Sequence, residues 1–251
     1  MFYIYDSYLS PPEAWSEFLT PTGSHSVRGS AYDSIFIALI VEERHKHDIL
    51  AGGFDGMYSY FASNGFSFGS SHQNWKAIKA FCDGNNLLFI PSIGPGYIDT
   101  SIRPWNNHNT RNRVNGRYYE TALQAALNVR PEIVTITSFN EWHEGTQIER
   151  AVPKKTVTRV YLDYQPHGPD HYLELTRRWA EQFNKEKEQW LMWVSSSNWL
   201  EASCSSGGVC NPHEMWSLIN VCAEGLGMVY LEVYKCSSAR REHKVDRELF
   251  L

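Results

Sequence analysis

Two glutamates three residues apart are the side chains in this sequence best suited to do chemistry. Glu141 and Glu144 lie in the segment FNEWHEG, directly after a β-branched stretch at residues 133–137. Glycoside cleavage needs one carboxyl group to protonate the leaving oxygen and a second to act as base or nucleophile. Polar side chains at the carboxyl end of a buried strand are typical of an active site. The pair therefore suggests acid–base chemistry on a sugar, and its spacing alone does not say which glutamate is the acid.

Two other interpretations of this segment have to be weighed. Glutamates three residues apart in a loop are often only solvated, so a purely structural role for the pair stays open beside the catalytic one. A zinc-protease interpretation needs the pattern HExxH, but Gln147 stands four residues after His143, where the second histidine belongs. The sequence also contains no Walker-type phosphate loop. We therefore expect neither a metal nor another cofactor.

Further polar and aromatic side chains could hold a substrate. Arg103 and Trp105 lie in a long polar loop after a predicted strand at residues 87–93. They could clamp a polar ligand or simply pin the loop, and the sequence leaves both possibilities open. The candidate substrate-binding residues are Tyr60, Arg103, Trp105, Asn140, Trp142 and His143.

The composition excludes some function classes. The chain has 251 residues, 42% hydrophobic and 20% charged, which is ordinary for a globular protein with a sizeable core. Its formal net charge is −5 and no basic cluster stands out, so we do not expect nucleic acid as a partner. No apolar run approaches the roughly 20 residues of a membrane span. The first residues, MFYIY, lack the basic start of a signal peptide. We therefore expect no membrane span, signal or anchor in this chain.

Alternating strand and helix patterns position the glutamate pair. Apolar stretches rich in Val, Ile, Phe and Tyr alternate with segments that carry apolar residues at helical spacing. Such alternation is typical of parallel βαβ units and predicts the α/β class. The predicted strands are residues 2–5, 35–41, 54–61, 87–93 and 132–139, and the predicted helices are residues 10–19, 42–50, 70–82, 115–128 and 169–188.

A partial (β/α)8 TIM barrel with an irregular C-terminal tail is the architecture that we expect. Loops lengthen after several of the strands, which is where such a barrel keeps its chemistry. A full barrel needs eight strands and typically ~250 residues, whereas the pattern here supplies about five of the eight strands. We predict two regions: the barrel part at residues 1–188, and a divergent, poorly ordered tail rich in Cys and Ser at residues 189–251.

Five segments of the sequence resemble a known enzyme family. TSFNEWHEGTQIE (residues 137–149) resembles the signature of the endo-α-1,2-mannosidases of glycoside hydrolase family 99. The other four segments are FYIYDSY, GFDGMYSYFA, SSHQNW and PSIGPGYIDTSIRPWN (residues 2–8, 53–62, 70–75 and 91–106). The resemblance covers about residues 1–188 and is strongest with vertebrate members of the family.

The resemblance implies a retaining hydrolase that cleaves inside glucosylated high-mannose N-glycans. The implied partner is such an oligosaccharide or an N-glycoprotein that carries it, and the product is Glc-α-1,3-Man or a longer glucosylated form. In the scheme proposed for the family, the sugar's own 2-hydroxyl forms a 1,2-anhydro intermediate. Glu141 then matches the base that assists the 2-hydroxyl. Glu144 matches the acid that protonates the leaving oxygen and later activates water. Tyr60 and Arg103 match positions in the substrate pocket.

The resemblance does not extend over the whole family pattern. The anchor, stem and first barrel strands of the family have no counterpart in this sequence, so we expect an N-terminally truncated barrel. Family members are anchored in the Golgi apparatus with a lumenal catalytic domain, which is the location that the resemblance implies. The expected function is an endo-α-1,2-mannosidase-like glycosidase. The alternative is a catalytically inactive isoform that retains a glycan-binding or regulatory role.

Overall fold

A computed structural model describes residues 1–157, 160–161 and 163–202, and four short strands between residues 214 and 237. The chain forms two units. The first comprises residues 1–179 with 222–229, and the second comprises residues 180–221 with 230–251. The glutamate pair and every residue discussed around it belong to the first unit.

Four parallel strands form the main sheet of the first unit. The strands β1 (Phe2–Ile4), β2 (Phe36–Leu39), β3 (Gly56–Tyr58) and β4 (Leu88–Ile90) follow one another in this order across the sheet. Each neighbouring pair is parallel. In β2, Ile37 pairs with Tyr3 on one side and Gly56 on the other. Parallel strands joined by helices confirm the predicted α/β class.

A second parallel pair continues the arrangement beyond β4. The strand β5 (Ser92–Ile93) pairs with β6 (Thr135–Ile136), and only Pro91 separates β4 from β5. The segment from β4 to β5 therefore contacts β3 through its first half and β6 through its second half. The backbone N–H of Thr137 still donates to the carbonyl of Ile93 at 2.7 Å. The ladder thus reaches the start of the glutamate segment, and the loops after β3, β5 and β6 leave from the same edge.

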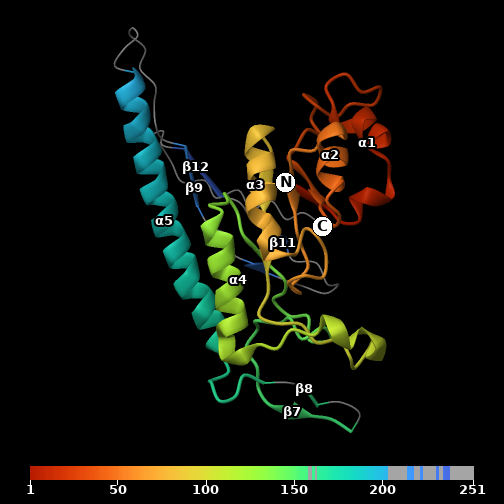
Figure 1. Ribbon diagram of the computed structural model, residues 1–251, viewed down its shortest axis with the longest axis vertical. Coiled ribbons are helices and arrows are strands. Elements are labelled where there is room, and N and C mark those ends of the chain that lie inside the picture. Colours follow the sequence, from red (N-terminus) through yellow and green to blue (C-terminus); the bar gives the residue numbers. More distant parts are fainter. Residues whose placement is uncertain are drawn as a thin grey trace. The chain divides into compact units, whose positions relative to one another are not determined.

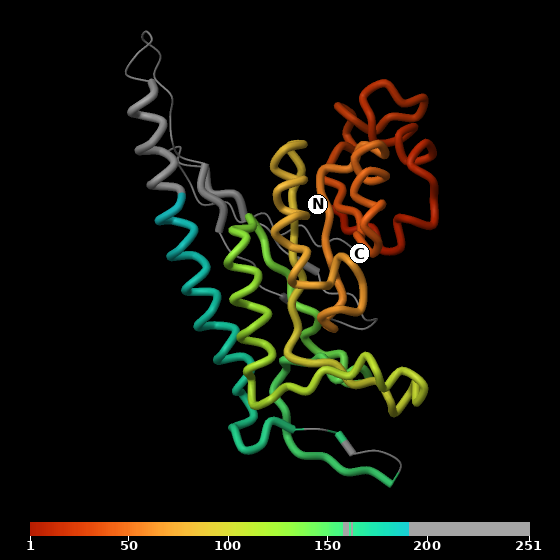
Figure 2. The backbone as a smooth tube through the Cα atoms, in the orientation of Figure 1, coloured from red at the N-terminus to blue at the C-terminus, as the bar shows by residue number. Residues whose placement is uncertain are grey.

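Helices connect and cover the strands. They are α1 (Pro12–Leu19), α2 (His45–Ala51), α3 (Trp75–Gly84), α4 (Arg117–Asn128) and α5 (His171–Ala202), with short 3-10 turns η1 (Ser7–Leu9), η2 (His72–Asn74), η3 (Pro104–Asn109) and η4 (Val114–Gly116). In Figure 1 they follow one another across the view in chain order, from α1 and α2 past α3 to α4 and the first turns of α5. Figure 2 shows the segment after β5, which contains η3, extending away from these helices.

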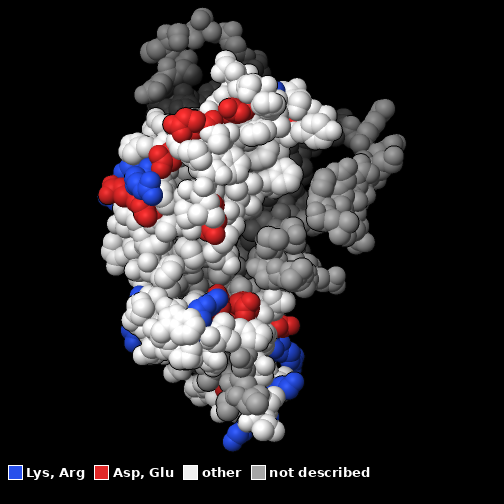
Figure 3. Space-filling model, turned by 90° about the vertical axis from the view of Figure 1, so that its right-hand side faces the viewer, with Lys and Arg blue, Asp and Glu red and all other residues white. Residues whose placement is uncertain are grey.

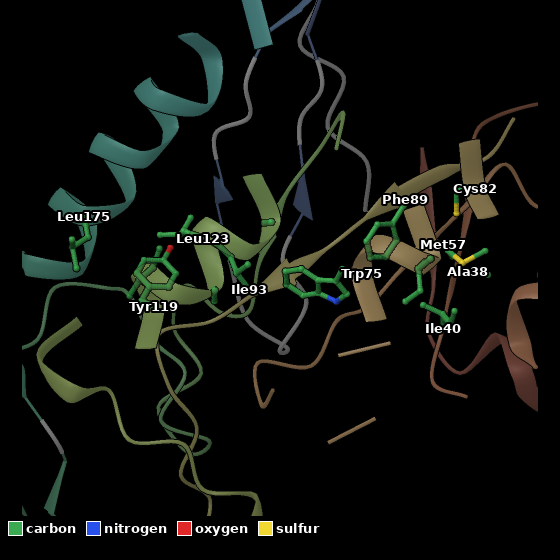
Figure 4. Packing of buried hydrophobic residues seen from close by; sticks show 14 of the residues in the cluster. Ala38, Ile40, Met57, Trp75, Cys82, Phe89, Ile93, Tyr119, Leu123 and Leu175 are labelled. Carbon is green, nitrogen blue, oxygen red and sulfur yellow. The ribbon is translucent and has the colours of Figure 1, made fainter. Parts of the chain in front are cut away.

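Large side chains from strands and helices share one core (Figure 4). Trp75, Phe89 and Tyr119 have no exposed surface. The indole N–H of Trp75 donates to the carbonyl of Gly69 at 2.8 Å, and the hydroxyl of Tyr119 shares a hydrogen bond with Thr176 Oγ1 at 2.9 Å. The polar ends of these rings are thus satisfied, so their burial stabilises the fold and ties the first turns of α5 to α4.

All five helices begin two to five residues later than the sequence predicted, and the starts of α1 and α3 have identifiable local causes. Helix α1 starts at Pro12, with Pro11 rather than Ser10 at the N-cap and no hydrogen bond from a capping side chain. Helix α3 starts only after η2, because Ser71 Oγ donates to the carbonyl of Ser67 at 2.6 Å. Ser71, which the predicted range placed inside the helix, therefore closes a turn in the preceding loop.

Helix α5 extends further than the predicted end near residue 188. It continues to Ala202 and crosses from the first unit into the second. No Gly or Pro lies within it, so nothing local stops the helix. In the second unit, β9 (Glu214–Ser217) pairs antiparallel with β12 (Tyr234–Ser237). The predicted domain boundary stays a prediction. The predicted poor order of residues 189–251 concerns mainly residues outside the described part.

Two further pairs of short strands complete the described elements. The strand β7 (Lys154–Lys155) pairs antiparallel with β8 (Val160–Tyr161), and β10 (Val221–Cys222) pairs with β11 (Tyr230–Leu231). None of the helices in the described residues is both long enough and apolar enough to cross a membrane.

Gly94 lies where three segments meet, and its substitution tests that packing. A Cβ atom at Gly94 would overlap Ala62 Cβ and the carbonyl oxygen of Thr137. We expect Gly94→Ala to lower the free energy of unfolding by about 1–3 kcal/mol, the usual cost of overpacking. Urea unfolding followed by circular dichroism measures this. Gly84→Ala is the matched control, because a Cβ there has no neighbour within 4 Å. Equal losses in both variants would contradict the described packing.

Candidate active site

The loop after β6 carries both glutamates on a base of buried hydroxyls. Ser138 Oγ accepts the backbone N–H of Glu141 at 2.9 Å and shares a hydrogen bond with Thr146 Oγ1 at 2.8 Å. The backbone N–H of Thr146 donates to the carbonyl of Glu141 at 3.2 Å, which closes the loop. Ser138 and Thr146 are buried, whereas the side chains of Glu141 and Glu144 are 34% and 26% exposed. The loop is thus fixed at its base while both carboxylates remain accessible.

Glu141 is oriented by its own loop. Its Oε1 accepts the backbone N–H of His143 at 2.8 Å and lies 3.4 Å from His143 Nδ1. The imidazole of His143 is itself 55% exposed. A hydrogen bond from the backbone fixes the carboxylate without using the mobile part of another side chain. The carboxylate of Glu141 is therefore held in one orientation at the surface of the loop.

Glu144 is held by the loop after β5. Arg103 Nη1 donates to Glu144 Oε1 at 2.9 Å, and the backbone N–H of Ile98 donates to the Glu144 carbonyl at 2.8 Å. The same Nη1 donates to Asp99 Oδ2 at 3.1 Å. Hydrogen bonds to Glu144 and then to Asp99 raise the pKa of Arg103, so the guanidinium stays charged. Glu144 therefore has a permanent cation beside it.

Tyr60 is joined through its backbone to the start of the glutamate loop. It stands two residues beyond β3 with a φ of 53°, a conformation that side chains with a Cβ rarely adopt. Its backbone N–H donates to Ser92 Oγ at 2.8 Å and its carbonyl accepts from Thr137 Oγ1 at 2.5 Å, which hold that conformation. Burial raises the pKa of Tyr60 to about 12, and the charges of Glu144 and Glu141 add to the rise. Tyr60 is therefore a protonated phenol that can donate a hydrogen bond at this place.

Three other predicted residues take different positions around the pair. The Trp105 side chain lies in η3 and is 78% exposed, and Asn140 is also exposed. Trp142 is half-buried: its indole N–H donates to Glu149 Oε2 at 2.8 Å and its ring packs edge-on against Tyr161. Trp142 therefore braces the loop, whereas Trp105 and Asn140 offer free surface to a ligand.

Arg113 supports the glutamate loop from behind. Its Nη2 donates to the carbonyls of Gly145 at 2.9 Å and Gln147 at 2.7 Å. Its guanidinium also lies over the rings of Tyr164 and Tyr172, 5.1 and 4.5 Å from their centroids. Arg113 therefore joins the C-terminal half of the glutamate loop to the beginning of α5.

Sequence reasoning did not select Asp99 or Arg113 for the site. Asp99 is fully buried, and its partner Arg103 stands four residues later in the same polar loop, a spacing that was available as a signal. Arg113 left no signal, because its acceptors are backbone carbonyls 32 and 34 residues away. Every residue has a backbone carbonyl, so a hydrogen bond to a distant carbonyl leaves no pattern of residue types in the sequence.

The acidic side chains of the site accept hydrogen bonds from other side chains. Glu144 and Asp99 share Arg103, and Glu149 accepts from Trp142. Within the residues that the structure describes, no group of three or more His, Cys, Asp or Glu side chains is arranged to hold a metal ion. These residues themselves can do proton transfer and can position a ligand by hydrogen bonds.

Comparison with known proteins identifies the family of this chain. The profile of Glycosyl hydrolase family 99 matches residues 1–185, from β1 to the first half of α5, and includes every site residue described above. The chain belongs to glycosyl hydrolase family 99. Membership confirms the resemblance that the motif at residues 137–149 indicated, and it makes the chain a member of a glycosidase family.

Several curated proteins are similar to this family 99 chain. The glycoprotein endo-alpha-1,2-mannosidase-like proteins of Danio rerio and Homo sapiens are 83% and 81% identical to it over 192 residues. These matches cover 76% of this chain and 43% and 42% of the relatives. The glycoprotein endo-alpha-1,2-mannosidase of Xenopus laevis is 69% identical, over 76% of this chain and 43% of its own length. The chain thus spans less than half the length of these relatives.

A solved structure has a similar fold. The GH99 endo-alpha-mannosidase from Bacteroides thetaiotaomicron superimposes with a TM-score of 0.72 at 49% sequence identity. The superposition covers 73% of this chain and 54% of that one. The arrangement of the strands and helices in the first unit is therefore shared with a family 99 enzyme.

Substitution of Arg113 tests its support of the glutamate loop. Arg113→Met keeps the aliphatic stem but removes the donor to the carbonyl of Gly145 and one of two donors to the carbonyl of Gln147, which also accepts from Tyr164 OH at 3.1 Å. We expect a loss of about 2–4 kcal/mol in the free energy of unfolding, because buried acceptors lose bonds to a charged group. We also expect faster proteolytic cleavage within residues 140–150. Arg117→Met, at an exposed position of α4, is the control. Unchanged stability and cleavage in Arg113→Met would show that the loop does not need this arginine.

Proposed function

We propose that this family 99 chain provides the catalytic pair of an endo-α-1,2-mannosidase that acts on glucosylated high-mannose N-glycans. One observation carries the proposal. Glu141 and Glu144 stand partly exposed on one loop after β6, and the phenol of Tyr60 feels the charge of both. Cleavage of a glycosidic bond requires a pair of accessible carboxyl groups. The family membership and the names of the relatives support the substrate class.

The two glutamates have distinct roles in the proposed reaction. Glu141 removes the proton from the 2-hydroxyl of the mannose residue, whose oxygen attacks the anomeric carbon, while Glu144 protonates the leaving oxygen and the glycosidic bond breaks. In the second half, Glu144 takes a proton from water as the water oxygen attacks the anomeric carbon. Glu141 returns its proton to the 2-oxygen as the anhydro ring opens. Two inversions at one carbon give net retention, and each carboxyl group returns to its starting state.

The contacts of each glutamate support this division. Glu141 is held by a backbone N–H and faces solvent on its loop, as a base that must reach a ring hydroxyl. Glu144 is held by Arg103, which fixes its direction toward one substrate oxygen. Tyr60 keeps its proton and can donate to a sugar oxygen between the two. The exposed ring of Trp105 supports a stacking role against a sugar face.

The charge distribution supports a neutral ligand. On the face shown in Figure 3, acidic and basic side chains of the described part lie in small groups near one another, and most of the drawn surface is uncharged. Interspersed charges of both signs do not build the single-sign field that attracts a polyanion. An oligosaccharide relies instead on hydrogen bonds and ring contacts.

The proposed architecture and location rest on the family. Five parallel strand segments with intervening helices support a (β/α)8 barrel of which the first unit is a part, as does the superposition on the bacterial enzyme. The location that we propose is the lumen of the Golgi apparatus, and it rests on the resemblance alone.

Substitution of either glutamate tests the proposed chemistry. Incubation of the purified chain with a glucosylated mannose oligosaccharide should release a glucosylated mannose fragment, detected by mass spectrometry. We expect Glu144→Gln and Glu141→Gln each to lower kcat by about 10²–10⁴-fold, the usual contribution of a positioned acid or base. Glu174→Gln, in the first turn of α5, is the matched control and should leave kcat unchanged.

The same experiment separates the enzyme from its alternative. Turnover in the wild type that survives both substitutions would refute the roles of the pair. Binding of the oligosaccharide without turnover, measured by calorimetry on a chain with a cooperative thermal transition, would favour a glycan-binding isoform and reject the enzyme.

The participation of the 2-hydroxyl gives a separate prediction. A substrate that lacks this hydroxyl on the mannose residue to be cleaved should bind but not be hydrolysed, because no internal nucleophile remains. The fully hydroxylated substrate is the control, and proton NMR should show its product with retained anomeric configuration. Hydrolysis of the 2-deoxy substrate, with a sugar covalently attached to a glutamate in the mass spectrum, would replace the proposed scheme by a carboxylate nucleophile.

A further inference from the structure

Asp99 is a buried acid that the proposed reaction does not use. Its Oδ2 accepts hydrogen bonds from Tyr97 OH at 2.9 Å, Asn106 Nδ2 at 2.8 Å and Arg103 Nη1 at 3.1 Å. The side chain has no exposed surface. Burial would raise the pKa of Asp99, but the donors Asn106, Arg103 and Tyr97 outweigh it and hold the pKa below its usual value. A fixed negative charge therefore lies behind Arg103.

One nitrogen of Arg103 connects this buried charge to the reaction site. Nη1 lies 3.1 Å from Asp99 Oδ2 and 2.9 Å from Glu144 Oε1. Asp99 has no exposed side-chain surface, whereas the Glu144 side chain is 26% exposed. Of the two carboxylates that bind Arg103, the buried Asp99 is thus the more rigid. Asp99 therefore fixes the position at which the guanidinium contacts Glu144. A cation shared by two carboxylates also stabilises each of them less than it would stabilise one alone.

We propose that Asp99 is a positioning residue that keeps Arg103 in place against Glu144 and reduces the positive charge which Glu144 experiences. The inference rests on the proposed role of Glu144 as acid and base. That role needs Glu144 to hold a proton in one half-reaction and to lose it in the other. An unopposed arginine would favour the carboxylate form throughout, and the counter-charge of Asp99 restores the balance.

The other titratable groups around Glu144 are three phenols, the carboxylate of Glu141 and the Arg103–Asp99 pair. Tyr5, Tyr60 and Tyr97 feel the charge of Glu144, but burial raises the pKa of each, so they stay protonated. Glu141 lies on the same loop and is paired with His143 at 3.4 Å. In the described residues, Arg103 and Asp99 are therefore the charges joined to Glu144 through hydrogen bonds.

Two variants that should shift the titration of Glu144 in opposite directions test the inference. Asp99→Asn keeps the shape but removes the counter-charge, so the carboxylate form of Glu144 gains stability. We expect the pH at which Glu144 titrates to fall by about one unit. Arg103→Gln removes the cation, so the same pH should rise. Carbon-13 NMR of the full chain with labelled glutamate carboxyl carbons measures this without substrate, and the spectrum of Glu144→Gln assigns the signal.

The pH profile of kcat should shift in the same directions as the titration of Glu144. The alkaline limb of the pH profile of kcat reports the group that must be protonated to act as acid. It should move to lower pH in Asp99→Asn and to higher pH in Arg103→Gln. Tyr97→Phe is the matched control: it removes one hydrogen bond to the same Oδ2 and no charge, so the limb should not move.

Each outcome decides the inference. Opposite shifts of the Glu144 titration in the two charge variants support it, and a titration that is unchanged in Asp99→Asn overturns it. If circular dichroism shows that Asp99→Asn does not fold, Arg103→Gln decides, because its side chain is 43% exposed and an unmoved titration there overturns the inference. Absence of wild-type turnover would reject the proposed function, while the NMR titration would still decide whether Asp99 controls Glu144.

Discussion

The site depends on one close approach between two loops. The backbone N–H of Ile98, after β5, donates to the carbonyl of Glu144, after β6, at 2.8 Å. The next residue, Gly145, has a φ of 61°, and a Cβ there would come within 2.5 Å of the Ile98 side chain. Only glycine combines this conformation with this separation. The contact brings Arg103 to Glu144, so the electrostatics of the pair follow from a backbone constraint.

Behind the two loops, hydroxyl groups replace part of the regular strand pairing. Ser92 Oγ accepts the backbone N–H of Tyr60 and bonds Thr135 Oγ1 at 2.6 Å, while Thr137 Oγ1 donates to the carbonyl of Tyr60. Ser92, Thr135 and Thr137 are buried. Their side chains satisfy backbone groups of Tyr60 at the point where its left-handed conformation leaves the strand. The backbone of Tyr60 is thereby fixed to β5 and to the start of the glutamate loop.

The accessible and the buried charged groups of the site have different roles. The accessible carboxylates of Glu141 and Glu144 can exchange protons with a ligand, while the buried Asp99 and the largely structural Arg113 only hold other groups. A buried charge needs hydrogen-bond partners, and Asp99 has its three donors on Oδ2, while its buried Oδ1 has no hydrogen-bond partner among the described residues. The buried charge thus lies deep in the loops, and the two accessible carboxylates lie at the surface.

The sequence by itself determined the α/β class, the order of strands and helices, and the segment that carries the glutamates. These follow from local hydrophobic periodicity and from a motif within 13 residues, 137–149. It could not determine where helices α1 and α3 begin, because prolines and serines compete between capping and turns. Only the tertiary structure decided that Arg103 bonds Glu144, that Asp99 lies behind it and that Arg113 carries the loop. Those contacts join residues up to 41 positions apart, and apart from the four-residue spacing of Asp99 and Arg103 no local pattern of residue types encodes them.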